Sequence, residues 1–211
     1  MDAELKNSIL KTGTTILGIV CKDGVVMAAD RRATIGHIIF SKDSEKVRVL
    51  NDYLVFAGCG SATETQKISK LLTVELKLKE LKSRVRPSVR QSASLLSNIQ
   101  ANESAFILAG FDEDGKTSLY EITGGHLNEV KDYTASVGSG MPFVLGLLER
   151  QYKKNISIEE GIKLAVESLK SSTQRDSASG NGIDVLTITK DGIKKVVEQT
   201  IESEYKDDKS R

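Results

Sequence analysis

Three Asp-Gly pairs between apolar, β-rich runs constrain the fold of this chain more than any other feature of its sequence. The pairs are Asp23-Gly24, Asp114-Gly115 and Asp191-Gly192. A two-residue hairpin turn needs backbone with positive φ, which glycine adopts easily, so an Asp-Gly pair between apolar strands is a strong short-range hairpin signal. The sequence therefore predicts three antiparallel hairpins, spread from one end of the chain to the other.

Four segments between the hairpins have the features of helices. Residues 61–83 are rich in Leu, Lys and Glu and give an apolar face, and Pro87 suits the first turn of a helix that runs to about residue 100. Pro142 opens a third helix that ends before residue 154. Ser157 and Glu160 form a capping box for a fourth helix, which runs to about residue 171.

Further strands are expected at residues 37–40, 45–50, 53–58 and 134–137. The chain then runs in the order strands, two helices, strands, two helices and a final hairpin. Hairpin-linked strands with helices grouped in pairs are typical of the α+β class. Because 211 residues suit a single core, we expect one domain with antiparallel sheets in the middle and a helix pair on each outer face.

Charge and composition exclude several classes of function. The 30 basic and 29 acidic residues nearly cancel, so no nucleic-acid or membrane partner is expected, and no apolar run approaches the roughly 18 residues of a membrane span. The first ten residues lack the apolar stretch of a secretory signal. Cys21 and Cys59 are too few for a disulfide framework, which favours the cytoplasm, and with His37 and His126 they form no metal-binding pattern. We expect no metal and no cofactor.

Two short motifs are chemically suggestive but weak. The GCGS run at residues 58–61 follows a strand and opens a helix, as a dinucleotide-binding loop would, yet the third glycine is missing and a second helix follows instead of a parallel strand. Ser8 and Lys11 have the Ser-x-x-Lys spacing of some acyl transferases, but nothing anchors them before the first strand. A tight turn and a chance match are the better interpretations.

A set of dispersed motifs is much more specific when its members are taken together and in order. They are Gly13-Thr14-Thr15, Asp30-Arg31-Arg32-Ala33-Thr34, Lys46, Ala57-Gly58, Gly138-Ser139-Gly140 and Gln174-Arg175-Asp176-Ser177-Ala178-Ser179-Gly180. In this order they resemble the β subunits of 20S proteasomes, the archaeal ones in particular, from residue 14 to about residue 203. The resemblance implies an N-terminal nucleophile hydrolase fold, a four-layer αββα sandwich of the α+β class, which agrees with the order of strands and helices.

The resemblance also gives a role to the Gly13-Thr14 pair. In this family the subunit cleaves its own Gly–Thr bond, which here makes residues 1–13 a propeptide and Thr14 the N-terminal nucleophile. A threonine hydroxyl needs a base, and a free α-amine, with a pKa of about 7.7–8.0, serves near neutral pH without any histidine.

The remaining catalytic residues follow from the same resemblance. Lys46 favours the alkoxide of the nucleophile and depresses the pKa of the new amine, and Asp30 holds Lys46 charged and oriented. The resemblance implies that three further side chains bind and orient the new N-terminal amine: Ser139, Asp176 and Ser179. The backbone N–H of Gly58 is the expected oxyanion donor.

Substrate contacts are also implied by the family. Thr34 is expected to pair through its backbone with an extended peptide, which is a β-augmentation mode of recognition. The wall of the specificity pocket is assigned to Ala33, Ser44, Phe56 and Gly60. None of these four side chains is charged, so the sequence predicts cleavage after uncharged, apolar residues.

The expected product is a threonine endopeptidase that works inside a closed chamber. Residues 1–13 form the propeptide, 14–203 the catalytic domain and 204–211 a charged, frayed tail. The resemblance implies partners in a seven-membered ring of β subunits, α subunits, an ATP-dependent regulatory particle that acts through the α ring, and unfolded polypeptide as substrate. Two alternatives stay open: a bacterial HslV-type threonine protease, and a non-catalytic or unprocessed β subunit with a structural role.

Overall fold

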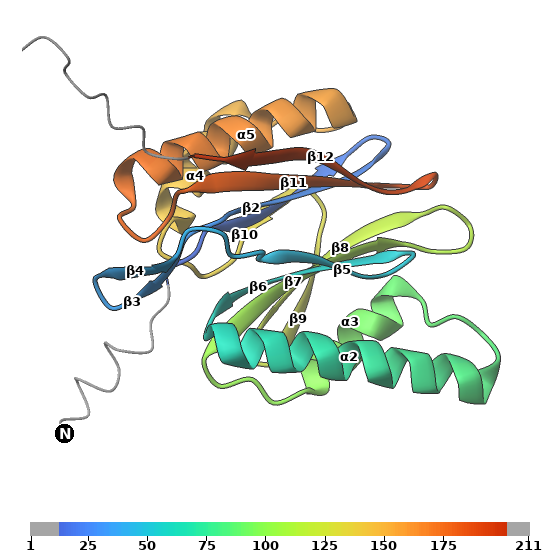
Figure 1. Cartoon of the computed structure of the whole chain (residues 1–211). Coiled ribbons are helices and arrows are strands. Elements are labelled where there is room, and N and C mark those ends of the chain that lie inside the picture. Colours follow the sequence, from blue (N-terminus) through green and yellow to red (C-terminus); the bar gives the residue numbers. More distant parts are fainter. Residues whose placement is uncertain (1–12, 202–211) are drawn as a thin grey trace, which may run out of the picture.

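The computed structural model describes residues 13–201 of the chain. Apart from Gly13, the expected propeptide lies outside the described residues, as do the Ser8 and Lys11 pair and the charged tail. Within this range two five-stranded antiparallel sheets are stacked, with a helix pair on each outer side (Figure 1). The expected four-layer α+β sandwich is confirmed.

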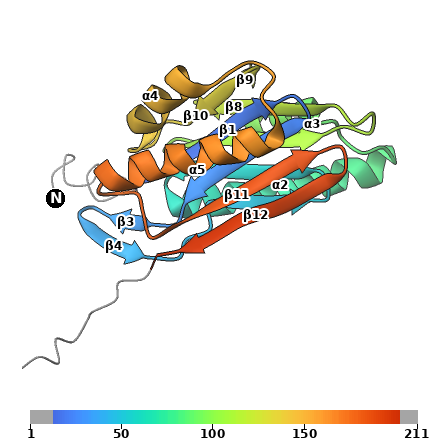
Figure 2. The ribbon, with the colours of Figure 1, turned by 90° about the horizontal axis from the view of Figure 1, so that it is seen from above.

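The first sheet has the strand order β10-β1-β2-β11-β12. Its strands are β1 (Ile16–Cys21), β2 (Gly24–Asp30), β10 (Tyr133–Ala135), β11 (Gly182–Thr189) and β12 (Gly192–Thr200). Helices α4 (Met141–Gln151) and α5 (Ile158–Arg175) cover its outer face (Figures 1 and 2). The capping box of Ser157 and Glu160 is present at the start of α5, which continues to Arg175, beyond the expected end at residue 171.

The second sheet has the strand order β5-β6-β7-β8-β9. Its strands are β5 (Val47–Asn51), β6 (Leu54–Gly60), β7 (Ser104–Phe111), β8 (Thr117–Thr123) and β9 (His126–Val130). Helices α2 (Ala62–Ser83) and α3 (Val89–Asn98) cover its outer face (Figure 1). Ser88 caps α3 and forms a capping box with Gln91, so Pro87 precedes the cap instead of lying in the first turn as predicted.

Apolar side chains form one layer between the two sheets and one under each helix pair. In β1, Ile16 packs between the sheets and Leu17 packs under α4 and α5. A third layer, which includes Phe56 and Leu72, lies between the second sheet and α2. Because β1 and β2 are buried on both faces, their sequences are continuously apolar instead of alternating.

All three Asp-Gly pairs lie at hairpins, but only two of the glycines have positive φ. Gly115 (φ +81°) lies in the β7–β8 connection and Gly192 (φ +118°) is the first residue of β12. Gly24 is the first residue of β2, where a Cβ atom would come within 2.3 Å of the Ile188 carbonyl oxygen. Close approach of β11, and not turn geometry, therefore explains Gly24. The sequence reading also missed β9, which follows the Gly124-Gly125 turn.

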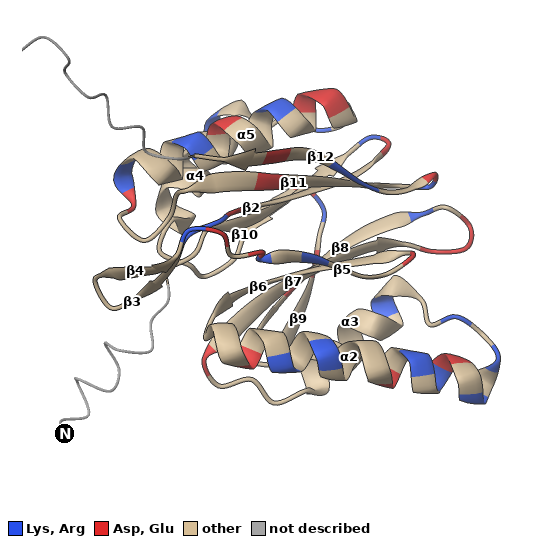
Figure 3. Cartoon of the chain, in the orientation of Figure 1, with Lys and Arg blue, Asp and Glu red and all other residues tan. Residues whose placement is uncertain are grey.

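A small hairpin of β3 (Ala33–Ile35) and β4 (Ile38–Ser41) extends from the body of the molecule next to the end of β2 (Figure 2). Its apolar side chains Ile38 and Phe40 are each 73% exposed. Lys and Arg are interspersed with Asp and Glu along α2 and α5 (Figure 3). Within residues 13–201 no helix has the length and apolar character that crossing a membrane requires.

Candidate active site

The three residues that precede β1 are each held by a side chain from another part of the chain. The backbone N–H of Gly13 donates to Thr34 Oγ1 (2.9 Å) and that of Thr14 donates to Ser139 Oγ (3.2 Å). The N–H of Thr15 donates to Asp30 Oδ1 (2.9 Å). Residues that are far apart in the sequence therefore fix the Gly13–Thr14 peptide bond in place.

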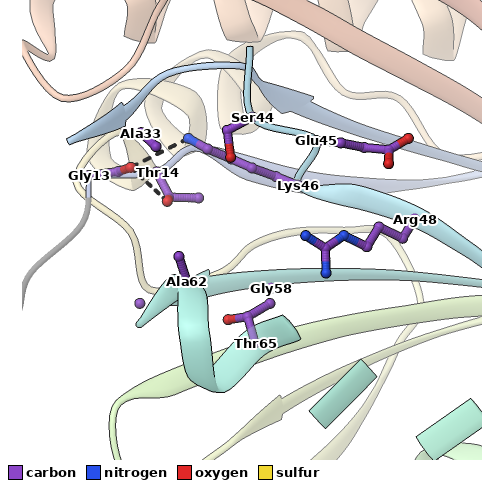
Figure 4. Close-up of a pocket in the computed structure, with 11 residues that line it drawn as sticks. Gly13, Thr14, Ala33, Ser44, Glu45, Lys46, Arg48, Gly58, Ala62 and Thr65 are labelled. Carbon is purple, nitrogen blue, oxygen red and sulfur yellow. Dashed lines mark hydrogen bonds between the residues drawn. The ribbon is translucent and has the colours of Figure 1, made fainter. Parts of the chain in front are cut away.

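The Gly13 carbonyl oxygen is contacted from two directions. The hydroxyl of Thr14 donates to it at 2.7 Å, and Lys46 Nζ lies 3.4 Å from the same oxygen (Figure 4). Thr14 is 4% exposed and Lys46 8% exposed, so both contacts are largely shielded from water. A hydroxyl group and an amine thus meet at one carbonyl oxygen.

Glycine at position 13 is required by its surroundings. A Cβ atom there would lie 1.8 Å from the Ala178 side chain and 2.8 Å from its backbone Cα. Since backbone cannot move aside as a flexible side chain can, any larger residue would displace the carbonyl from Thr14. The loop that contains Ala178 therefore sets the position of the bond.

Asp30, at the end of β2, is fully buried and accepts four hydrogen bonds. Its Oδ1 accepts from the Thr15 N–H and from Lys46 Nζ (2.6 Å), and its Oδ2 accepts from the N–H groups of Arg32 and Gly180 (both 3.0 Å). Burial lowers the pKa of Lys46, and the charge of Asp30 opposes that shift. The ion pair with Asp30 therefore favours the charged form of Lys46, whereas burial favours the neutral form.

The second carboxylate of the site, Asp176, is the C-cap of α5 and binds two hydroxyl groups. Ser139 Oγ donates to Asp176 Oδ2 at 2.6 Å and Ser179 Oγ donates to the same atom at 2.5 Å. The hydroxyl groups of Thr15 and Ser179 lie 2.7 Å apart. The Ser139 hydroxyl thus links the Asp176 carboxylate to the nitrogen of Thr14, and the Ser179 hydroxyl links it to the side chain of Thr15.

Arg32 fixes the loop that holds Ser179. Its Nε donates to Asn181 Oδ1 and its Nη1 to the Ser177 carbonyl oxygen, both at 2.7 Å. Its guanidinium also covers Gly180, where a Cβ atom would approach Nη2 to 2.7 Å. The arginine thereby holds the loop on both sides of Ser179.

Arg31 extends away from this loop, toward the segment that precedes Lys46. It forms ion pairs with Asp43, Asp184 (3.5 Å) and Glu198 (3.3 Å). Burial raises the pKa of Asp184, whose side chain is 1% exposed, while Arg31 opposes the rise. The two neighbouring arginines therefore secure different parts of the site.

A cavity lies against Thr14 and contains most of the expected substrate-binding residues. Ala33, Ser44 and Gly60 line it, together with Gly58. Phe56 does not, and its assignment to the pocket wall was wrong. It is fully buried under α2, with its ring 5.3 Å from that of Phe106.

Four lining residues were not predicted from the sequence: Glu45, Arg48, Ala62 and Thr65. Arg48 follows Lys46 by two positions, and side chains two apart in a strand share a face, so alternation was the signal that could have found it. Thr65 belongs to α2 and lies against Gly58, where a Cβ atom would come within 2.3 Å of Thr65 Cγ2. Glycine at position 58 therefore has a packing reason beside its expected role as oxyanion donor.

The structure gives no support to a cofactor loop at residues 58–61. Gly60 has φ +102°, and a Cβ atom there would lie 2.0 Å from the Glu103 carbonyl oxygen, as suits a tight strand-to-helix turn. Ser61 caps α2 by accepting from the Glu64 N–H. Among residues 13–201 no group of three His, Cys, Asp or Glu side chains is placed to hold a metal ion.

Comparison with known proteins agrees with this geometry. The family model described as "Proteasome subunit" matches residues 10–188. "Proteasome subunit beta" of Methanocaldococcus vulcanius is 38% identical over 206 residues, covering 94% of this chain and 92% of that protein. "Proteasome subunit beta" of Nanoarchaeum equitans is 41% identical, with coverage of 87% and 96%, and "Proteasome subunit beta 1" of Thermococcus onnurineus is 41% identical, with coverage of 90% and 96%. The chain therefore belongs to the proteasome subunit family, alongside archaeal β subunits.

Proposed function

We propose that this chain is a threonine endopeptidase, the catalytic β subunit of a 20S proteasome core. One observation carries the proposal. The Thr14 hydroxyl and the amine of Lys46 meet at the Gly13 carbonyl oxygen, at 2.7 and 3.4 Å. A nucleophile next to an electrophilic carbonyl, with a cation to stabilise the charge that develops on oxygen, is the arrangement that acyl transfer requires.

The first reaction of this site is cleavage of its own Gly13–Thr14 bond. Thr14 Oγ1 attacks the Gly13 carbonyl carbon, the C–N bond breaks, and the hydroxyl proton ends on the Thr14 nitrogen, which leaves an ester. Water then hydrolyses the ester and releases residues 1–13 with a new carboxylate. The hydrogen bond of Thr14 Oγ1 to the Gly13 carbonyl oxygen supports this sequence of steps, because it holds the hydroxyl next to the group that it attacks.

Removal of the propeptide supplies the base for the second reaction. The Thr14 nitrogen, which donates to Ser139 Oγ in the intact chain, becomes an α-amine beside the Asp176 hydroxyl cluster. An α-amine has a pKa of about 7.7–8.0, and the charge of Lys46 nearby depresses it further. The amine accepts the proton of Thr14 Oγ1 as the hydroxyl attacks a peptide substrate, so one residue provides both nucleophile and base.

Two further elements support peptide cleavage. Gly58 borders the cavity beside Thr14, where its N–H is proposed to stabilise the oxyanion. Thr34, which binds the Gly13 N–H in the intact chain, is proposed to bind the backbone of an extended substrate after processing. The propeptide end thus marks the position that substrate takes later.

The proposed partners follow from the family. We propose a seven-membered ring of β subunits against α subunits, with an ATP-dependent regulatory particle delivering unfolded polypeptide through the α ring, in the cytoplasm. Relatives named as β subunits of archaeal proteasomes support this assembly over an HslV-type protease. A non-catalytic β subunit is the remaining alternative. The hydrogen bonds of Thr14 and Lys46 to the same Gly13 carbonyl oxygen, together with the Lys46–Asp30 ion pair, argue against it.

Intact-mass measurement after assembly with α subunits tests the proposal. The wild-type chain is expected to lose residues 1–13, and the particles to cleave fluorogenic peptides. The Thr14→Ala variant is expected to keep its full mass and to be inactive, while Thr14→Ser, which keeps a hydroxyl, is expected to be processed. Active particles that still begin at Met1 would refute the mechanism, and assembled particles inactive on every peptide would favour a structural subunit.

A further inference from the structure

Arg48 in β5 places a positive charge in the cavity beside Thr14. Its guanidinium points toward the space between Lys46 and Thr65 (Figure 4). The side chain is partly buried, and its Nη1 donates to Ser69 Oγ at 3.4 Å. Within residues 13–201 no carboxylate forms an ion pair with Arg48, so its charge is not neutralised by the described part of the chain.

The other two charged residues that line the cavity, Lys46 and Glu45, already form ion pairs within the chain. Lys46 Nζ binds Asp30 at 2.6 Å and is directed at the Gly13 carbonyl. Glu45 extends away from the cavity centre in Figure 4, its side chain is 54% exposed, and its carboxylate pairs with Lys195 at 3.7 Å. The charge available to an incoming side chain is therefore positive and belongs to Arg48.

The other residues that line the cavity leave room for a substrate side chain and carry no charge that would attract or repel it. These residues are small and uncharged: Ala33, Ser44, Gly58, Gly60, Ala62 and Thr65. Because Gly13, Thr14 and Lys46 also border the cavity, a side chain that enters it belongs to a residue next to the bond that Thr14 attacks. The cavity is therefore placed to bind the side chain of the substrate residue next to the cleaved bond.

We propose that Arg48 is a specificity-determining residue, which selects an acidic side chain, Asp or Glu, immediately before the cleaved bond. The inference rests on the proposed peptidase function and replaces the expectation of an apolar preference drawn from the sequence. A guanidinium matches the two oxygens of a carboxylate, whereas a basic side chain at the same place is repelled. A neutral apolar side chain gains nothing from the charge and removes some of its water.

The wild-type particle tests this directly with matched substrates. Fluorogenic peptides that differ only in the residue before the fluorophore, Glu, Gln, Leu or Arg, are compared by kcat/KM. Hydrogen bonds to charged groups contribute enough for about a 10- to 100-fold preference. We expect Glu to exceed its neutral isostere Gln by at least about tenfold, with Arg the poorest substrate.

The Arg48→Met variant then assigns the preference to one side chain. It keeps the apolar stem and removes the charge, so cleavage after Glu is expected to fall about 10- to 100-fold while cleavage after Leu stays within about threefold. Arg48→Lys is expected to restore part of the preference for Glu. Arg90→Met, at an exposed position on α3, is the matched control and is expected to change no ratio.

The outcomes separate this inference from the proposed function. A wild-type particle that prefers Leu, Gln or Arg, or an Arg48→Met variant with an unchanged Glu-to-Leu ratio, overturns the role of Arg48 while leaving the peptidase intact. A particle that cleaves none of the peptides overturns both. Should Arg48→Met fail to assemble, the Glu-to-Gln ratio of the wild type alone decides the matter.

Discussion

The two halves of the site are built on different kinds of structure. We call Asp30 and Lys46 the strand half, because Asp30 ends β2 and Lys46 directly precedes β5. We call Ser139, Asp176 and Ser179 the loop half, because they lie in the connections that border α4 and α5. Both halves centre on a buried carboxylate, and both contact the Gly13–Thr15 segment.

The carboxylates differ in what they bind. Asp30 accepts from an ammonium group and three backbone N–H groups, all of which can donate a hydrogen bond but cannot accept one. Asp176 accepts from one backbone N–H, that of Ala178, and from two hydroxyl groups, each of which can rotate and accept a hydrogen bond in turn. The strand half therefore fixes a charge, and the loop half provides an adaptable network around the Thr14 nitrogen. Substitutions in the strand half are therefore expected to abolish activity, whereas substitutions in the loop half are expected to reduce it gradually.

Substitution of Lys46 should have the largest effect. Lys46→Ala is expected to abolish both peptide cleavage and self-processing, because it removes the cation at the Gly13 carbonyl and leaves Asp30 buried without its partner. Lys46→Arg is expected to fail as well, since a planar fork does not replace a point charge. Intact mass and a peptide assay measure both functions. Lys42→Ala, an exposed neighbour, is the control, and activity in either Lys46 variant contradicts the mechanism.

The pH profile tests the charge of the strand half. In the proposed mechanism Lys46 acts when protonated. Because burial lowers its pKa, the alkaline fall in kcat/KM is expected below the ordinary lysine pKa of about 10.4. Asp30 raises that pKa, so Asp30→Asn is expected to shift the fall to still lower pH and to reduce the maximum rate. If the alkaline limb of the pH profile does not move in Asp30→Asn, Asp30 does not control the pKa of the group that titrates there.

A graded loss is expected in the loop half. Ser139→Ala removes the hydroxyl between Asp176 and the Thr14 nitrogen, and the loss of hydrogen bonds to a charged group predicts a fall in kcat of about 10- to 100-fold. Ser177→Ala, an exposed side chain in the same region, is the control and should be near normal. If Ser139→Ala were as inactive as Lys46→Ala, the contrast between the halves would be lost.

The smallest effect is expected from Arg32, which acts on the loop half from outside. Arg32→Met removes bonds to Asn181 and to the Ser177 carbonyl but leaves every group that touches the Gly13–Thr15 segment. We expect kcat to fall about 2- to 10-fold with little change in KM, because the loop loses order while the cavity keeps its lining. Arg32→Lys should recover part of the rate. An unchanged kcat would show that the loop keeps its position unaided.

The fold and the residues in both halves of the site were predicted from the sequence, the site residues from the family resemblance, but the lining of the cavity was predicted only in part. The hairpins and the capping box of α5 depend on neighbouring residues, so local patterns predict them well. Phe56 was assigned to the pocket wall from the family resemblance, and the pattern of β6 could not correct this, because β6 is apolar on both faces. Assigning Phe56 to the layer under α2 needed the register of β6 against β7, which is a tertiary property.

The lining of the cavity also depends on tertiary packing that local sequence patterns do not show. Thr65 meets Gly58 only because α2 packs across the end of β6, and no local signal describes that crossing. The partners of Arg31 and Arg32 lie up to 167 positions away in the sequence, and their arrangement depends on where β11 and β12 pair. Features that depend on neighbouring residues could therefore be predicted from the sequence. Side-chain contacts between elements that are distant in the sequence could not.

The burial of β1 and β2 on both faces has a consequence for dynamics. Leu17 and Ala28 face each other across the pair and are fully inaccessible, so their amides are expected to exchange hydrogen only when the whole domain unfolds. Thr14 and Asp30 adjoin the ends of these strands. Thr14 and Asp30 are thus attached to the slowest-opening part of the molecule, so we expect their positions to stay constant during the proposed reaction without any closing motion.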